Sequence, residues 1–207
     1  MKSKKTILLI FLLLVIIGAA VISFYYDTND KINNIDKALA KDMAYHAKAG
    51  DIESQYNYAE CYVFGFGVKQ DFEKAVFWFT KAAEQGHPIA QYRLGFCYFD
   101  GCGVEKDSEK GLFWYIKSAE QGCDLAQYWL GVFYRFGNLG IQDDEMAVFW
   151  FTKSAEQGNS MSQYYLGQCY HYGIGVKQDL EQAVFWYTKS AEQDNENAIN
   201  ALKSINE

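Results

Sequence analysis

Apolar and polar positions follow one another along this chain with the spacing of paired amphipathic helices, and the same pair is written four times. The dipeptide Gln-Tyr returns at residues 55, 91, 127 and 163, and a tryptophan returns at residues 78, 114, 150 and 186, so the period is 36 residues. A unit of this length is one supersecondary motif that cannot bury its apolar face alone. The pattern therefore predicts a solenoid in which each unit packs on its neighbours.

Each unit is predicted to fold as two helices, A and B, joined by a glycine-rich turn. In the second unit, Leu94 and Tyr98 lie on one face of helix A, and Gly95 permits the close approach of another helix. Gly101 can end helix A because glycine adopts positive φ at little cost. Asp107 can then accept the free N–H groups at the start of helix B. The other units carry Asp71, Asp143 and Asp179 at this place.

Helix B is nearly identical in the four units, which indicates a packing role. We therefore predict that the four periodic tryptophans fill core or inter-repeat positions rather than contact a ligand. The third turn differs, because its second glycine, Gly140, comes one residue late and the next segment is one residue shorter. We expect a reshaped turn there, with the helices still in register.

The recurring motifs Tyr-x-Leu-Gly-x-x-Tyr, Gly-x-Gly-Val, Asp, Ala-Val-Phe-Trp and Lys-Ala-Ala-Glu-Gln-Gly resemble the Sel1-like repeat, a relative of the tetratricopeptide repeat, over residues 50–193. Ala59 in place of the repeat glycine, the altered third turn and Asp194 in place of the closing glycine depart from that pattern. The resemblance implies an all-α protein, built as a right-handed α/α superhelix whose concave face is lined largely by A helices and binds proteins. It also implies a bacterial adaptor or scaffold rather than an enzyme.

This organisation divides the chain into four parts. They are a signal-anchor or signal peptide (1–26), a linker with an N-terminal capping helix (27–48), four repeats (49–193) and a C-terminal capping helix (194–207). The repeats cover residues 50–85, 86–121, 122–157 and 158–193. We expect polar-faced caps because a solenoid needs them for solubility, and we expect the last helix to run through Leu202.

The N-terminal segment has two open interpretations. Lys2, Lys4 and Lys5 precede an apolar run from Ile7 to Ile22. Its length approaches the roughly 20 residues that span a bilayer, which favours an uncleaved anchor. The small residues from Gly18 to Ala20 instead suit a cleaved signal peptide. Either way the lysines stay cytoplasmic and the repeats are exported, so we expect a single-pass inner-membrane protein with periplasmic repeats, or a secreted or periplasmic protein after cleavage.

Composition narrows the class of partner. A net charge of -7 and a pI near 5.0 argue against a nucleic-acid or anionic-membrane surface, which needs a basic face. The three histidines (His46, His87, His171) are far apart and no Cys-x-x-Cys pair exists, so we expect no metal and no cofactor. The resemblance adds a β-lactam-binding or β-lactam-hydrolysing envelope protein as an alternative. However, the chain has no Ser-x-x-Lys motif for a serine acyl-enzyme.

The five cysteines are predicted to remain mostly free thiols. Cys61, Cys97 and Cys169 share one repeat position, which Phe133 fills in the third unit, so they act as apolar core residues. Equivalent positions in stacked helices lie about 8–10 Å apart, beyond the roughly 7 Å Cα separation that a disulfide allows.

The candidate binding surface emerges when the four copies are compared with one another. The helix A positions that differ most are spaced i, i+4, i+7 and i+11, which is one helical face. In chain order they are Glu53, Asn57, Glu60 and Phe64; Ile89, Arg93, Phe96 and Asp100; Leu125, Trp129, Val132 and Phe136; and Met161, Tyr165, Gln168 and Tyr172. The face becomes aromatic towards the C-terminal half, and aromatic residues with an arginine dominate protein-binding energetics. We predict a partner-binding surface formed by Arg93, Phe96, Trp129, Val132, Phe136, Tyr165, Gln168 and Tyr172.

Two alternatives stay open. The aromatic side chains can instead cover the next repeat, as aromatic stripes at helical spacing usually do. If they bind a partner, it is a protein of unknown identity. It belongs either to the organism's own envelope, with the chain as scaffold, or to a toxic or foreign protein that the chain neutralises as an immunity-type factor.

Overall fold

The computed structural model describes residues 34–137, 140 and 142–205. The membrane-targeting segment predicted at residues 1–26 lies outside these residues. The elements of the described part are helices, which confirms the predicted all-α class, and they belong to two units, residues 1–71 and residues 72–207. Across the described ranges, no helix is both long enough and apolar enough to cross a bilayer.

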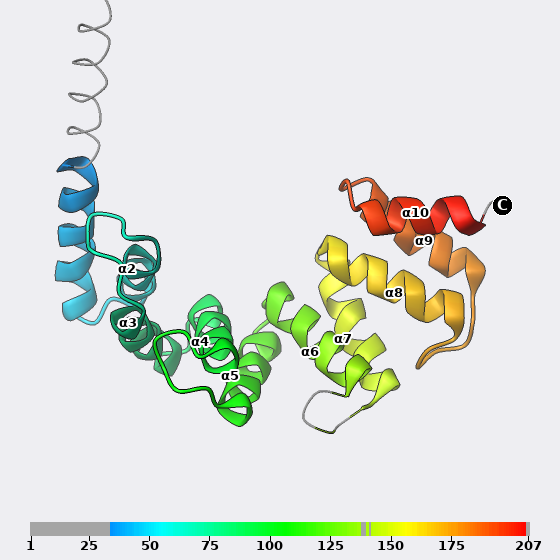
Figure 1. Cartoon of the computed structure of the whole chain (residues 1–207), viewed down its shortest axis with the longest axis horizontal. Coiled ribbons are helices and arrows are strands. Elements are labelled where there is room, and N and C mark those ends of the chain that lie inside the picture. Colours follow the sequence, from blue (N-terminus) through cyan, green and yellow to red (C-terminus); the bar gives the residue numbers. More distant parts are fainter. Residues whose placement is uncertain (1–33, 138–139, 141, 206–207) are drawn as a thin grey trace, which may run out of the picture. The chain divides into compact units, whose positions relative to one another are not determined.

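The N-terminal unit contains a helix over residues 34–48 and α2, Ile52–Phe64 (Figure 1). The Asp51 side chain accepts a hydrogen bond from the Ser54 N–H at 2.7 Å, which caps the start of α2. Gly65 ends the helix with a φ of 75°. A Cβ at Gly67 would collide with the backbone carbonyl of Asp36, so the turn after α2 lies directly on the helix of residues 34–48.

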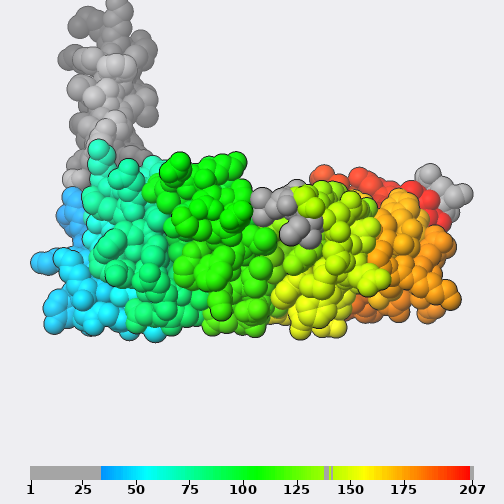
Figure 2. Space-filling view, turned by 90° about the horizontal axis from the view of Figure 1, so that it is seen from below, coloured from blue at the N-terminus to red at the C-terminus, as the bar shows by residue number. Residues whose placement is uncertain are grey.

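The C-terminal unit consists of α3 and three further helix pairs, followed by a final helix (Figure 1). The helices are α3 (Phe72–Glu84), α4 (Pro88–Asp100), α5 (Ser108–Glu120), α6 (Asp124–Phe136), α7 (Asp144–Glu156), α8 (Ser160–Tyr172), α9 (Leu180–Ala191) and α10 (Glu196–Ile205). Each of the A helices α4, α6 and α8 packs against the B helix of its own repeat and against the B helix before it. Figure 2 shows these repeats side by side in chain order, as a solenoid requires. The handedness of the superhelix stays a prediction.

The C-terminal helix is longer than expected. It continues past Leu202 to Ile205, because Leu202 and Ile205 both pack against the cluster around Ala183, Tyr187 and Ala198. The Asn195 side chain accepts hydrogen bonds from the N–H groups of Asn197 and Ala198 at the start of α10, at 3.1 and 3.3 Å.

The aspartates predicted to open the B helices cap three of them. In α5, α7 and α9 the cap carboxylate accepts the backbone N–H three residues later. The three pairs are Asp107 with Lys110, Asp143 with Met146 and Asp179 with Gln182, at 3.0, 2.9 and 3.0 Å. These bonds satisfy N–H groups that have no partner within the helix, which fixes where each B helix starts.

The third turn keeps the helices in register, as expected. The Asp143 N–H donates to the Tyr134 carbonyl at 2.9 Å, the same bond that Asp107 makes to Tyr98 in the repeat before. The surroundings of Gly140 differ from those of the second glycine in the turn before. A Cβ at Gly103 would collide with the Phe72 carbonyl, whereas one at Gly140 would meet nothing within 4 Å.

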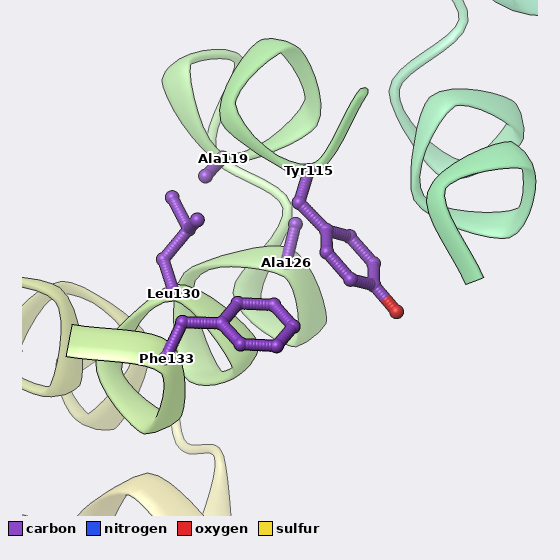
Figure 3. Close-up of a cluster of buried hydrophobic side chains, with 5 residues drawn as sticks. All are labelled: Tyr115, Ala119, Ala126, Leu130 and Phe133. Carbon is purple, nitrogen blue, oxygen red and sulfur yellow. The ribbon is translucent and has the colours of Figure 1, made fainter. Parts of the chain in front are cut away.

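The core is a series of clusters between helices, one of which is drawn in Figure 3. It contains Tyr115, Ala119, Ala126, Leu130 and Phe133 from α5 and α6. Trp150, from the same repeat as α6, packs against this cluster between the second and third repeats, and Trp186 packs against the next cluster. For these two tryptophans the predicted core or inter-repeat position is confirmed.

Glycines in the A helices make room for large B-helix side chains. A Cβ at Gly95 would lie 3.0 Å from Cδ1 of Tyr115, and one at Gly131 would lie 2.5 Å from Cδ1 of Phe151. Tyr115 and Phe151 are almost fully buried. Gly95 therefore permits the close helix approach that the sequence predicts.

The glutamine of the second, third and fourth Gln-Tyr pairs is a buried clamp between helices. Its amide nitrogen donates to a carbonyl in the last turn of the preceding B helix, and its oxygen accepts from a glutamine at the end of its own B helix. The amide nitrogens donate from Gln91 to the Ala83 carbonyl, from Gln127 to the Ala119 carbonyl and from Gln163 to the Ala155 carbonyl, at 3.0, 3.1 and 3.2 Å. The amide oxygens of the same three residues accept, in that order, from the side chains of Gln121, Gln157 and Gln193, at 2.7, 2.7 and 2.8 Å. Both polar ends of a buried side chain are thus satisfied.

The cysteines at the shared repeat position are core residues. Cys61, Cys97 and Cys169 are buried, as is Phe133 at the same position in the third unit. Burial raises the pKa of Cys169 to about 12, so its thiol stays protonated at neutral pH. All five cysteines are free thiols in the structure.

Candidate partner-binding surface

A groove lies at the C-terminal end of the varied A-helix face, where α6, α8 and α10 meet. It encloses a volume of about 440 Å³. Its lining residues are Arg135, Phe136, Tyr164, Tyr165, Gln168, Tyr172, Ile174 and Asn197. Four of these were predicted from sequence as partner-binding: Phe136, Tyr165, Gln168 and Tyr172. We call this site the C-terminal groove.

A second cavity of about 310 Å³ adjoins the C-terminal groove. Tyr164, Gln168, Tyr172 and Asn197 line both cavities. The second cavity also reaches His171, Tyr187, Asn200, Ala201 and Ser204. Together the two cavities make one extended polar and aromatic depression along α8 and α10.

One wall of the groove is fixed by the core. Tyr165 stacks on the buried ring of Phe151, with ring centroids 5.3 Å apart and an interplanar angle of 8°. Phe136 meets Tyr165 edge to face at 6.2 Å and stays 55% exposed. Tyr165 therefore contacts the buried ring of Phe151 on one side and the exposed ring of Phe136 on the other. The Phe136 side chain is thus partly ordered beforehand and loses less conformational entropy when a partner binds.

The other wall carries an exposed aromatic pair. Tyr172 is 63% exposed and stacks on His171, with ring centroids 4.3 Å apart. Nδ1 of His171 lies 3.5 Å from the Tyr187 hydroxyl. His171 is half-buried. A stacked ring pair whose inner ring contacts Tyr187 offers a rigid surface to a partner side chain.

Polar groups at the groove offer hydrogen bonds. The Gln168 amide donates to the Tyr164 hydroxyl at 2.8 Å. Burial raises the pKa of Tyr164, against the smaller opposing effect of this hydrogen bond, so its hydroxyl is neutral at physiological pH. Arg135 supplies the positive charge among the lining residues. Its guanidinium carbon lies 5.5 Å from the centroid of Phe136, and its Nη1 lies 3.4 Å from Oδ1 of Asp144.

The remaining predicted residues lie elsewhere. Trp129 is half-buried against the cluster around Tyr115 and Phe133, and Val132 packs against the cluster around Phe151. Arg93 and Phe96 belong to α4 and do not line the groove, although Phe96 is 41% exposed. A role for these four in binding stays a prediction.

Sequence comparison of the copies missed four lining residues, which are Arg135, Tyr164, Ile174 and Asn197. Arg135 shares a repeat position with Val63, Phe99 and His171, so this position also varies and could have been found by the same comparison. Tyr164 belongs to the constant Gln-Tyr pair, so a search for varied positions passes over it. Asn197 lies in α10, one period after Met161 of the varied face, so the same comparison extended past the fourth repeat could have found it.

Metal ligands do not gather at this site. Within the described ranges, no group of three or more His, Cys, Asp or Glu side chains is placed to hold a metal ion.

A family model described as "Sel1 repeat" matches four consecutive segments, residues 52–87, 88–123, 124–159 and 160–195. None of the curated proteins matches the chain. These four segments correspond to the helix pairs α2–α3, α4–α5, α6–α7 and α8–α9.

Among solved structures, a Sel1 repeat protein from Oxalobacter formigenes is 38% identical, with a TM-score of 0.79 over 82% of this chain and 49% of that one. A protective antigen with an SLR fold, present in uropathogenic Escherichia coli strains, is 38% identical, with a TM-score of 0.75 over 79% of this chain and 35% of that one. This chain therefore spans about half of the first protein and about a third of the second. An immunity protein from Pseudomonas aeruginosa shares the fold at 20% identity, with a TM-score of 0.51 over 77% of this chain and 58% of that one.

Proposed function

This chain belongs to the Sel1 repeat family, which is generally a non-catalytic scaffold for protein interactions, and we propose that it binds a protein partner in the C-terminal groove. The main support for the proposal is that residues chosen from the sequence lie together in the structure. Phe136, Tyr165, Gln168 and Tyr172 were selected because they vary between copies, and they line one groove.

The chemistry of the groove suits a protein segment. Binding hot spots are enriched in tyrosine and arginine that pack in well-ordered, desolvated sites. Tyr165 and Tyr172 are held by neighbouring rings, and Arg135 lies over Phe136, so three of these anchors are ordered before a partner arrives. The amides of Gln168 and Asn197 can pair with a partner's backbone.

We further propose that the repeats act on the outer side of the cytoplasmic membrane. The support is the sequence alone: the lysines before the apolar run predict a cytoplasmic N-terminus, and the repeats follow on the other side. The segment then serves as an anchor, or as a signal peptide if it is cleaved.

The immunity-type alternative uses the same groove for a different partner, a toxic or foreign protein. The likeness to the Pseudomonas immunity protein supports the shared fold only. The identity of the captured protein separates the two: a component of the organism's own envelope favours the scaffold, and a secreted toxin favours neutralisation.

The test is affinity capture with the full chain, followed by mass spectrometry. Tyr172→Ala should abolish capture of the partner, because it removes an exposed groove ring. Phe185→Ala is the matched control, since Phe185 of α9 is 47% exposed and lies outside the groove. The proposal fails if both variants retain the partner equally, or if hydrolysis of nitrocefin by the purified chain reveals a β-lactamase.

A further inference from the structure

The B helices carry a row of exposed phenylalanines, one in each repeat. They are Phe77, Phe113, Phe149 and Phe185 of α3, α5, α7 and α9, and their exposed fractions are 52%, 51%, 46% and 47%. Each ring meets the tryptophan that follows it edge to face, with ring centroids 5.0–5.1 Å apart. This contact leaves a large part of each phenylalanine in water, and clustered exposed apolar groups mark interaction sites.

Charged side chains flank the phenylalanine row on both sides. A glutamate stands four residues before each phenylalanine and a lysine stands four residues after it, and all of them are exposed. The glutamates are Glu73, Glu109, Glu145 and Glu181. The lysines are Lys81, Lys117, Lys153 and Lys189. Residues four apart are neighbours on one helix face, about 6 Å apart along its axis. Because the repeats lie side by side in chain order (Figure 2), the triplets form three parallel rows, which we call the B-helix stripe.

The charges of the B-helix stripe are available to a partner. Within the described residues, its four glutamate side chains make neither an ion pair nor a hydrogen bond. The lysine ammonium groups lie over the phenylalanine rings of their own helices, with Nζ 5.1–5.9 Å from the ring centroids. A cation–π contact at an exposed site is weak and leaves the N–H groups of the ammonium able to bond to a carboxylate.

We propose that the B-helix stripe binds a second copy of this chain. A two-fold axis along the phenylalanine row runs the B helices of the two copies antiparallel. Phenylalanines then meet phenylalanines, and the glutamate row of each copy meets the lysine row of the other. At the ends of the last three B helices, the exposed Glu120, Glu156 and Glu192 face Lys106, Gln142 and Gln178 of the second copy. No row therefore meets its own charge.

Two features favour a second copy over other partners. The stripe repeats with a period of 36 residues, and a second copy has the same period, so each repeat adds the same contact. A uniformly basic or acidic partner, including an anionic membrane, would pair with one charged row and meet like charge in the other. The dimer is weak because exposed ion pairs contribute little, so the chain is a monomer at dilute concentration.

The test uses two double variants of the full chain that each reverse one charged row at α5 and α7. One is Glu109→Lys with Glu145→Lys, and the other is Lys117→Glu with Lys153→Glu. Sedimentation velocity in a density-matched neutral detergent, with a reducing agent, measures the dissociation constant. We expect the unchanged chain to pass from monomer to dimer as its concentration rises. Each double variant alone should dimerise at least about tenfold more weakly, because four ion pairs become like-charge contacts. An equimolar mixture of the two should recover the original affinity.

The matched control is Lys41→Glu with Lys177→Glu, which changes the net charge equally at exposed positions outside the stripe and should dimerise as the unchanged chain does. Circular dichroism checks that every variant keeps its helices. The proposal is overturned if the unchanged chain stays monomeric up to its solubility limit, if both double variants dimerise unchanged, or if their mixture does not recover. The stripe shares no residue with the C-terminal groove, so partner capture there is unaffected by any of these results.

Discussion

The buried glutamine hydrogen bonds between the helices, which we call the ladder, are the same in each of three repeats, whereas the varied face of the A helices changes from repeat to repeat. In the ladder, each copy places the same glutamine in the same bonds: Gln91, Gln127 and Gln163 each join two B helices. On the varied face, equivalent positions differ in chemistry. Asn57, Glu60 and Phe64 line an apolar, acidic pocket, whereas Tyr165, Gln168 and Tyr172 line an aromatic groove with an arginine.

The two regions are therefore under different physical constraints. A buried polar clamp must be satisfied in every copy, because an unpaired buried amide costs about 1–3 kcal/mol. The face of the A helices does not hold the helices in register, so each copy is free to present different side chains. The following changes test this division, and the largest effects are expected in the ladder and core.

Phe151→Ala should give the largest loss of stability. Phe151 is fully buried, fills the space above Gly131 and stacks on Tyr165, so its removal leaves a cavity and should cost about 3–5 kcal/mol. Phe149→Ala is the matched control two residues away, because that ring is 46% exposed, and it should cost less than about 1 kcal/mol. Urea unfolding followed by circular dichroism measures both. Equal losses would break the distinction between scaffold and surface.

Trp129→Ala tests a residue on the border between the two regions. Trp129 packs 6.2 Å from Phe133, and it donates a side-chain hydrogen bond that opposes the burial-raised pKa of Tyr92. We expect a loss of about 2–3 kcal/mol, below that for a fully buried tryptophan, because the ring is half-exposed. Unchanged stability with loss of partner capture would instead assign Trp129 to the binding surface.

Gln127→Ala should have a moderate effect. It removes two hydrogen bonds, to the Ala119 carbonyl and from Gln157, and the carbonyl keeps its bond from the Gly122 N–H, so about 1–2 kcal/mol should be lost. Gln182→Ala is the control, since this exposed α9 side chain lies outside these bonds and should cost less than about 0.5 kcal/mol. The same unfolding measurement decides, and an equal loss for the two variants would contradict the clamp.

Asp194→Gly should stabilise the chain slightly. Asp194 closes the fourth repeat with a φ of 60°, where Gly86, Gly122 and Gly158 close the earlier ones at 95°, 92° and 97°. Glycine relieves left-handed strain but loses more entropy on folding, so the net gain should be about 0.5 kcal/mol. Asp194→Ala should destabilise, because alanine resists this conformation. A gain for alanine would show that the position is not strained.

Much of the frame could be predicted from sequence because its physics is local and repeated. Asp107, Asp143 and Asp179 were identified as caps from spacing alone, since a cap needs only a carboxylate three residues before its donor. The period placed Trp150 and Trp186 between repeats. The shifted Gly140 predicted a reshaped turn, and the bond from Asp143 to Tyr134 shows the register it preserved.

The candidate site was predicted only in part. Variation between copies selected Phe136, Tyr165, Gln168 and Tyr172, but it could not show that Trp129 leans into the core, because both roles place an aromatic residue at helical spacing. Asn197 comes from α10, which follows the four matched repeats and packs against α9, and Asp36 and Leu39 of the apolar, acidic pocket come from the helix of residues 34–48, which precedes them. A comparison confined to the four repeats reaches neither helix.

Site-specific photo-crosslinking tests the central claim most directly. A benzophenone amino acid replaces Tyr172 at the C-terminal groove or, as the control, Phe185 on the exposed side of α9, and the full chain is irradiated in its native cells. The account predicts a crosslinked protein partner from position 172 and, from position 185, none other than a second copy of the chain. A different partner that crosslinks only from position 185 would contradict it, because its binding surface would then lie on the repeated B helices.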